Sequence, residues 1–158
     1  MARKLTTAFR GYLKQSSNDA NMYQTLATGL QQGENYGLLI KRVEFELDSP
    51  FVAAWANADV SIIASLRRGA PSGVFLGRSN PGNIVNWTFA CTAQASSVNL
   101  LIPTTFTWDA PPNLVIADTE MSVQFDSTAT GQPNRLDYVV YAERTVLTPG
   151  QVIQLRAW

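Results

Sequence analysis

The stretch Leu38-Leu-Ile-Lys-Arg-Val-Glu-Phe-Glu-Leu47 decides the fold class of this chain. Within it Val43, Phe45 and Leu47 take alternate positions, and charged residues fill the positions between them. Successive side chains of a strand point to opposite faces of a sheet, so this alternation predicts a strand with one buried face and one solvated face. The segment Asp59–Arg67 alternates in the same way.

Seven further segments have the length and composition of strands. They are Val74–Gly77, Ile84–Ala93, Val98–Trp108, Leu114–Ala117, Met121–Asp126, Leu136–Val146 and Val152–Ala157. The connections between them are rich in Gly, Pro, Asn and Asp, which favour turns because Gly accepts positive φ and Pro restricts φ. Short strands at this spacing predict an all-β fold, an antiparallel eight- to nine-stranded sandwich or jelly roll.

The N-terminal part of the chain has a different character. Residues 1–35 are polar, rich in Gln and Asn, and show no clear alternation. We therefore predict an N-terminal arm over residues 1–35 and a β-sandwich (jelly-roll) domain over residues 36–158. Short helices are predicted over Asp19–Leu30 and after Ser49, where Pro50 takes the first helical position. The first residues lack the apolar run of a signal peptide, which predicts synthesis in the cytoplasm.

The composition argues against catalysis. The chain has 158 residues, no His and a single Cys, so it has no imidazole base, no His-containing zinc site and no internal disulfide. There is no Gly-rich phosphate loop, no nucleophile elbow and no metal-ligand spacing. We therefore expect a protein without enzymatic activity, cofactor or metal.

Two pairs of carboxylates are the remaining candidates for acid–base chemistry. Glu44 with Glu46, and Asp118 with Glu120, stand two residues apart and would share one face of a strand. The outer face of a half-buried strand carries charges in any case, and we interpret both pairs in this way. The enzyme alternative requires a concave site with two convergent carboxylates.

The zero net charge of the chain hides an uneven distribution. Residues 1–14 carry a charge of +4, and the rest of the chain carries −4. The basic residues of this segment and the aromatic residues among them are Arg3, Lys4, Phe9, Arg10, Tyr12 and Lys14. Such a set can bind phosphates weakly and without sequence specificity, with its aromatic rings stacked on bases. Packing against another subunit and an ordinary solvated terminus are the other interpretations.

The middle of the chain is almost free of charge. From Ser79 to Ala117 the only charged residue is Asp109. Surfaces buried between subunits are depleted in Lys, Glu and Asp and enriched in aromatic residues. Our candidates for a subunit interface are Phe51, Trp55, Trp87 and Trp108. Frequent Asn, Gln, Ser and Pro argue against a membrane span. Tryptophans at strand ends also suit a sugar-binding surface, so a lectin-like module or fibre head is the alternative.

An antiparallel domain of eight or nine strands, poor in charge and preceded by the basic segment Arg3–Lys14, resembles viral jelly-roll coat proteins. The resemblance covers the whole chain, with Leu38 to Trp158 as the barrel, and it concerns architecture only. It implies a non-enzymatic, self-assembling subunit of a virus capsid or similar closed shell, located in the virion and made in the host cytoplasm. The implied partners are other copies of the chain, other virion proteins and, through weak contacts of the arm, genomic nucleic acid.

Overall fold

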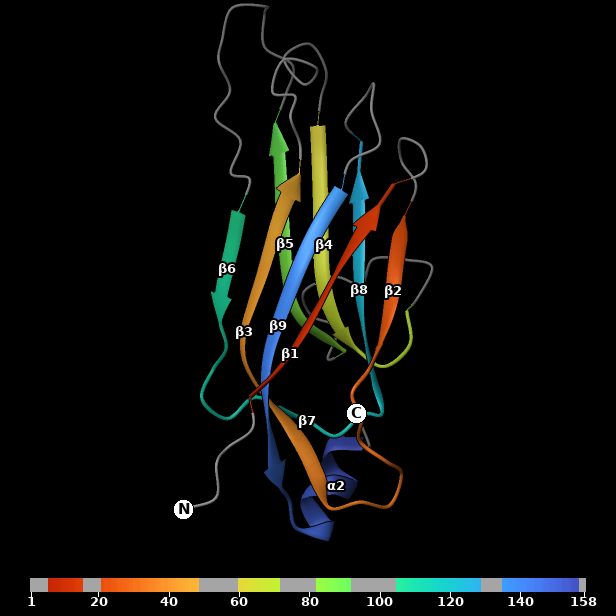
Figure 1. Cartoon of the computed structure of the whole chain (residues 1–158), viewed down its shortest axis with the longest axis vertical. Helices are drawn as coiled ribbons and strands as arrows, with labels where there is room; N and C mark the ends of the chain where they lie inside the picture. Colours follow the sequence, from red (N-terminus) through yellow and green to blue (C-terminus); the bar gives the residue numbers. More distant parts are fainter. Residues whose placement is uncertain are drawn as a thin grey trace, which may run out of the picture.

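The computed structural model describes residues 6–15, 21–48, 60–71, 82–91, 105–128 and 135–156 (Figure 1). These residues form nine strands and one helix. The strands are β1 (Thr6–Lys14), β2 (Met22–Ala27), β3 (Tyr36–Asp48), β4 (Val60–Arg68), β5 (Asn83–Cys91), β6 (Thr105–Asp109), β7 (Val115–Ile116), β8 (Glu120–Ser127) and β9 (Arg135–Val146), and the helix is α2 (Pro149–Arg156). Within these ranges no helix has the length and apolar character needed to cross a membrane.

The strands form two facing antiparallel sheets, which confirms the predicted all-β sandwich. Sheet A has the order β1-β9-β3-β6, with β7 also paired to β3, and sheet B has the order β2-β8-β4-β5. The edge strands β1 and β2 lie on one side of the sandwich, and the edge strands β5 and β6 lie on the other (Figure 1). We call these the β1–β2 side and the β5–β6 side.

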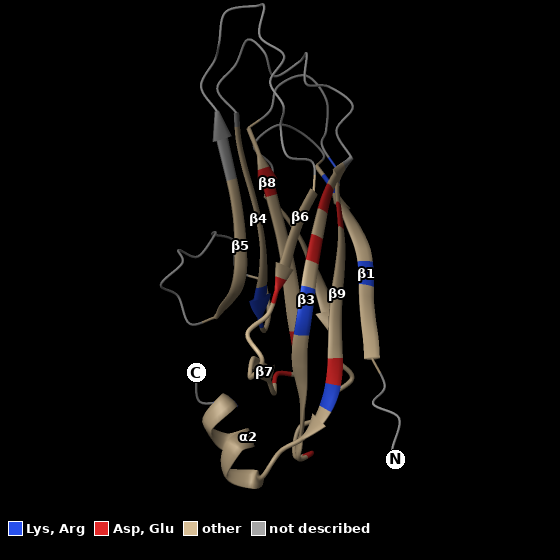
Figure 2. Cartoon of the chain, turned by 90° about the vertical axis from the view of Figure 1, so that its left-hand side faces the viewer, with Lys and Arg blue, Asp and Glu red and all other residues tan. Residues whose placement is uncertain are grey.

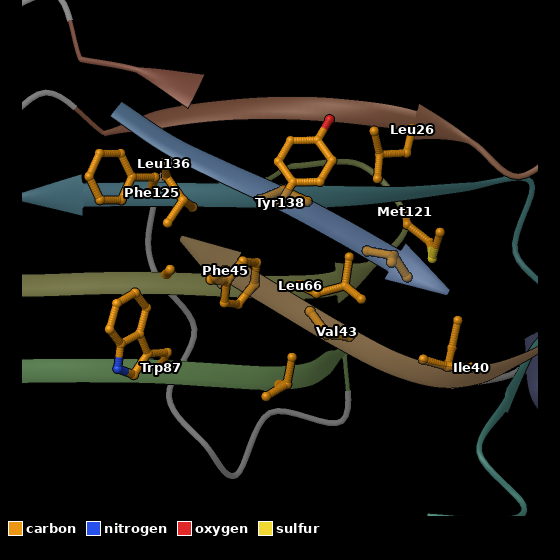
Figure 3. Close-up of a cluster of buried hydrophobic side chains, with 14 of the residues drawn as sticks. Leu26, Ile40, Val43, Phe45, Leu66, Trp87, Met121, Phe125, Leu136 and Tyr138 are labelled. Carbon is orange, nitrogen blue, oxygen red and sulfur yellow. The ribbon is translucent and has the colours of Figure 1, made fainter. Parts of the chain in front are cut away.

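The core lies between the sheets and is made from alternate residues of the facing strands (Figure 3). The largest fully buried side chains include Phe45, Leu66, Met121, Phe125, Leu136 and Tyr138. Three rings close the core toward β5 and β6: Phe106 stacks on Phe45 with 6.1 Å between centroids, and on Trp87 with 5.7 Å. Each fully buried side chain of this size contributes about 1.5–3 kcal/mol.

Strand β3 changes its phase at Lys41. Ile40 pairs with Ala142 and Arg42 pairs with Tyr141, so Lys41 is an extra residue in the ladder, a β-bulge. Even-numbered positions face the core before the bulge, and odd-numbered positions face it afterwards. The regular alternation that predicted this strand therefore begins only at Arg42.

The arm predicted over residues 1–35 is corrected by the structure. Strand β1 pairs with β9 along its whole length, and β2 pairs with β8, so residues 6–14 and 22–27 of this segment belong to the two sheets. The helix predicted over Asp19–Leu30 is also wrong, because β2 occupies its centre.

The weak alternation of β1 has a packing explanation. One of its inward positions is Gly11, and a Cβ at this residue would lie 2.3 Å from Tyr138 Oη. The Tyr138 hydroxyl fills this space and donates a hydrogen bond of 2.9 Å to Gln24 Oε1 on β2. A tyrosine from β9 thus replaces the apolar side chain that a regular pattern would place on β1.

The C-terminal segment Val152–Ala157, predicted as a strand, lies largely in α2 instead. Thr148 Oγ1 accepts a hydrogen bond from Gln151 N at 3.3 Å, and Gln151 Oε1 accepts one from Thr148 N at 2.8 Å. This capping box, with Pro149 at the first helical position, starts the helix. The sequence Thr148-Pro-Gly-Gln151 carries this signal.

Helix α2 packs on a small cluster separate from the main core. Its buried members are Ala117, Leu147 and Val152. Arg156 donates a hydrogen bond of 3.1 Å to the Ala117 carbonyl. Arg68 bonds to the Asp118 carboxylate at 2.7 Å and also donates to the carbonyl of Leu155 near the end of the helix. Two arginines therefore hold α2 against the base of the sandwich.

Candidate subunit interface

The outer face of sheet A concentrates charge (Figure 2). Its charged residues are Arg10, Lys14, Lys41, Arg42, Glu44, Glu46, Asp109, Arg135, Asp137 and Glu143. The Arg42 guanidinium contacts the Asp109 carboxylate at 2.7 Å, and this hydrogen bond and charge raise the pKa of Arg42. Ion pairs between exposed side chains add little stability. This face has the character of a solvated surface.

The β5–β6 side has a different character. Its described residues, 82–91 and 105–117, include one charged residue, Asp109. Strand β5 pairs with β4 and strand β6 pairs with β3, and neither has a second strand partner within the described ranges. Neither strand contains Lys, Arg or Pro, the residues that protect strand edges from pairing with other chains. This side is therefore suited to contact with another protein chain.

A groove of about 300 Å³ runs between the two edge strands. Its lining residues are Asn83, Ile84, Val85, Asn86, Phe106 and Trp108. They combine apolar surface with amide groups, and none of them is charged. Aromatic and aliphatic surface without charge is typical of the core of a protein–protein interface.

The structure separates the tryptophans that we predicted at an interface. Trp87 is 7% exposed and stacks on Phe106, so it is a residue of the core. Trp108 is partly buried and lines the groove. Phe51 and Trp55 lie outside the described residues.

The described basic residues of the N-terminal segment lie on the opposite side of the sandwich. Arg10, Tyr12 and Lys14 are exposed on β1, whereas Phe9 is partly buried and packs against the core. Arg3 and Lys4 lie outside the described residues. The structure thus places three of the six predicted residues in one outward row and assigns Phe9 to packing.

Strand β9 adds a residue that our sequence reasoning missed. Arg135 pairs in register with Lys14, and its guanidinium lies 4.3 Å from the centroid of the Tyr12 ring. Arg135 also bonds to Asp137 at 2.6 Å. Because Arg135 follows Lys14 by more than a hundred residues, only the pairing of β1 with β9 brings the two together.

The carboxylate pairs do not form a concave site. Glu44 faces Arg42 at 3.6 Å and accepts a hydrogen bond of 3.4 Å from the Tyr141 hydroxyl, and Asp118 is bound by Arg68. A second groove of about 580 Å³, between α2 and the base of sheet A, has only uncharged lining residues, as the first groove has. No cluster of three metal-binding side chains occurs in the described ranges.

Comparison with known proteins gives a likeness of fold. No protein-family model and no curated protein sequence matches the chain. VP1 of Trichodysplasia spinulosa-associated polyomavirus, solved in complex with GM1 oligosaccharide, is similar over 91% of this chain and 96% of its own, with a TM-score of 0.50 and 8% identity. Merkel cell polyomavirus VP1, in complex with GD1a oligosaccharide, is similar over 94% and 97%, with a TM-score of 0.48 and 8% identity. The first likeness confirms the predicted jelly-roll fold of viral coat proteins.

Proposed function

We propose that this chain is a structural, non-enzymatic subunit that assembles with other copies of itself into a virus capsid or similar closed shell, as part of the virion. The β5–β6 side carries the proposal. Among the described residues, this side has two strands with a partner on one edge only, and the groove at Trp108 lies between them. Burial against a neighbouring copy would satisfy the strand edges and remove the apolar groove from solvent. The VP1-like fold supports the same proposal.

Sedimentation velocity and negative-stain electron microscopy of the purified protein test this proposal. We expect closed particles or discrete oligomers whose fraction rises with protein concentration. A single monomeric species at high protein concentration would contradict it.

We also propose that the outward row of β1 makes a weak, non-specific contact with the genomic nucleic acid. Arg10 and Lys14 stand two residues to either side of Tyr12 on β1, and the Arg135 guanidinium lies 4.3 Å from the centroid of the Tyr12 ring. Asp137 offsets the charge of Arg135. Phosphates bind such cations, and an exposed aromatic ring can stack on a base. Fluorescence anisotropy with oligo-dT at rising salt measures the contact. Lys14→Ala should reduce the slope of log affinity against log salt by about 0.7, and an unchanged slope would argue against this role.

Carbohydrate binding is the second candidate function. The groove places Trp108 beside the amide-bearing residues Asn83 and Asn86, and a few polar groups beside an apolar surface are typical of small-molecule sites. The VP1 structure of the Trichodysplasia spinulosa-associated polyomavirus contains an oligosaccharide. Saturation-transfer NMR with soluble glycans tests this function. Glycan binding by a stable monomer, lost in Trp108→Ala, would favour it over the shell subunit.

A further inference from the structure

The two sides of the sandwich match in strand direction. Each sheet contains a path of four strands with antiparallel neighbours, so the first and last strands of a path run in opposite directions. When a second copy lies beside the first with its strands aligned, its β2 comes next to β5, and its β1 comes next to β6. Both contacts then bring together antiparallel strand edges, the arrangement in which neighbouring strands form a regular ladder.

Residues on the two sides also lie at the same height along the strands. On sheet B, Tyr23 pairs with Gln124, Gln124 pairs with Ser65, and Ser65 pairs with Asn86. Tyr23 and Asn86 therefore stand at opposite ends of one row across the sheet. In copies that lie side by side, Tyr23 of one copy reaches the level of Asn86 of the other, and Asn86 lines the groove.

The chemistry of Tyr23 fits the groove. Its side chain is 55% exposed, and the structure shows no hydrogen bond or ring contact between it and the described residues. On the face of sheet B that Tyr23 shares with Asn86, the groove offers the Ile84 side chain as an apolar wall and the Asn86 amide as a neighbour of the phenol hydroxyl. Tyr and Trp are also the residue types enriched among those that dominate binding energy.

The charges on the two sides are of opposite sign. Strand β1 carries Arg10 and Lys14 and no acidic residue, whereas β6 carries Asp109 and no basic residue. Asp109 stands on the row that ends at Ala8, two residues from Arg10 on β1. Asp109 is already bound by Arg42 of its own copy at 2.7 Å, so Arg10 of a neighbouring copy would share this carboxylate as a second cation. A shared carboxylate favours this pairing of sides over contact between two β1–β2 sides, which would bring only cations together.

We propose that the β1–β2 side of one copy docks on the β5–β6 side of the next copy, with Tyr23 seated in the groove. This inference rests on the proposed function as a self-assembling shell subunit. The two surfaces differ, so the contact is heterologous, and each copy offers one surface of each kind. Repetition of such a contact closes into a ring when the rotation between copies permits it.

Two variants that each disable one surface test the proposal. Tyr23→Ala removes the anchor, and Thr88→Arg places a bulky charge at an exposed β5 position two residues from Asn86. Sedimentation velocity should show a dissociation constant at least about tenfold above that of the wild type for each variant alone. An equal mixture should form a one-to-one dimer that does not grow, because the intact groove of one variant accepts Tyr23 of the other.

Controls separate this contact from folding and from assembly in general. Ile153→Asp, at a 70% exposed position on α2, should assemble like the wild type. Circular dichroism and the unfolding midpoint show whether each variant is folded, and Trp108→Ala is a second groove variant. If the wild type assembles and both surface variants assemble equally well, the contact is wrong and the shell function stands. If the wild type stays monomeric, both the proposed contact and the proposed shell function are wrong. Monomeric variants whose mixture forms no dimer would overturn the heterologous contact.

Discussion

Substitution of Gly11 by alanine places a methyl group where the Tyr138 side chain already lies. The new Cβ would be 2.3 Å from Tyr138 Oη and 2.7 Å from Cζ. Tyr138 is 2% exposed and its hydroxyl is bonded to Gln24, so the ring cannot withdraw without breaking that hydrogen bond. Overpacking costs about 1–3 kcal/mol, and the lost hydrogen bond costs about 0.5–1.5 kcal/mol. We expect the free energy of unfolding to fall by about 2–4 kcal/mol.

Urea unfolding, followed by tryptophan fluorescence at a protein concentration that keeps the chain monomeric, measures this loss. In thermal unfolding the midpoint should fall by about 5–12 °C. Tyr138→Phe removes the Oη atom. In that background the loss of unfolding free energy caused by Gly11→Ala should be smaller by at least about 0.5 kcal/mol. Gly150→Ala is the matched control, because its Cβ would meet nothing within 4 Å and alanine favours the helix.

A Gly11→Ala variant within about 0.5 kcal/mol of the wild type, a range typical of surface substitutions, would show that Tyr138 does not oppose the new methyl group. An equal loss of unfolding free energy with and without the Tyr138 hydroxyl would contradict the expected clash with Oη, because the loss would then arise elsewhere.

Three further outcomes follow from the packing, the helix cap and the titration of the core. Trp87→Ala should lower the free energy of unfolding, measured in urea, by about 3–5 kcal/mol, as for a core tryptophan. Trp108→Ala should lower it clearly less, and equal losses would place both tryptophans in the core. Gln151→Ala removes the Gln151 half of the capping box and should lower the free energy of unfolding by about 0.5–1.5 kcal/mol, with faster amide exchange confined to α2. Burial raises the pKa of Tyr138 above its usual value of 10.0. Above pH 10.0 the unfolded chain therefore loses the phenol proton more readily than the folded chain does, and the free energy of unfolding falls as the pH rises toward the raised folded-state pKa. Tyr138→Phe should therefore lose less stability above pH 10.0 than the wild type does in unfolding titrations.

The sequence predicted most strands of the sandwich because their two faces differ in polarity. Strand β3 is the clearest case, since Val43, Phe45 and Leu47 alternate with charged residues and face the core as predicted. Strand β1 was missed because Gly11 stands at an inward position and the atoms that fill this space come from Tyr138. No pattern within residues 6–14 contains that information.

The sequence predicted the residue composition of the candidate site, and it did not predict how the strands of the site are arranged. The charge-poor stretch from Ser79 to Ala117 was visible in the sequence, and it includes both edge strands of the β5–β6 side. That β5 and β6 belong to different sheets and share a groove depends on strand order, which periodicity does not record. The sequence did not predict a role for Tyr23, because the proposed role depends on the cross-strand row that runs from Tyr23 to Asn86.

The pairing of β1 with β9 has a consequence for the order of events during synthesis. Thr6 pairs with Glu143, so β1 leaves the ribosome long before β9, its strand partner among the described residues, has been made. At about 5–20 residues per second, the delay is on the order of ten seconds. Strand β9 is also the partner of β3, so sheet A has no centre until β9 emerges. A nascent chain therefore has no finished β1–β2 side to present to a neighbour, and late closure of sheet A delays self-association until translation has passed β9.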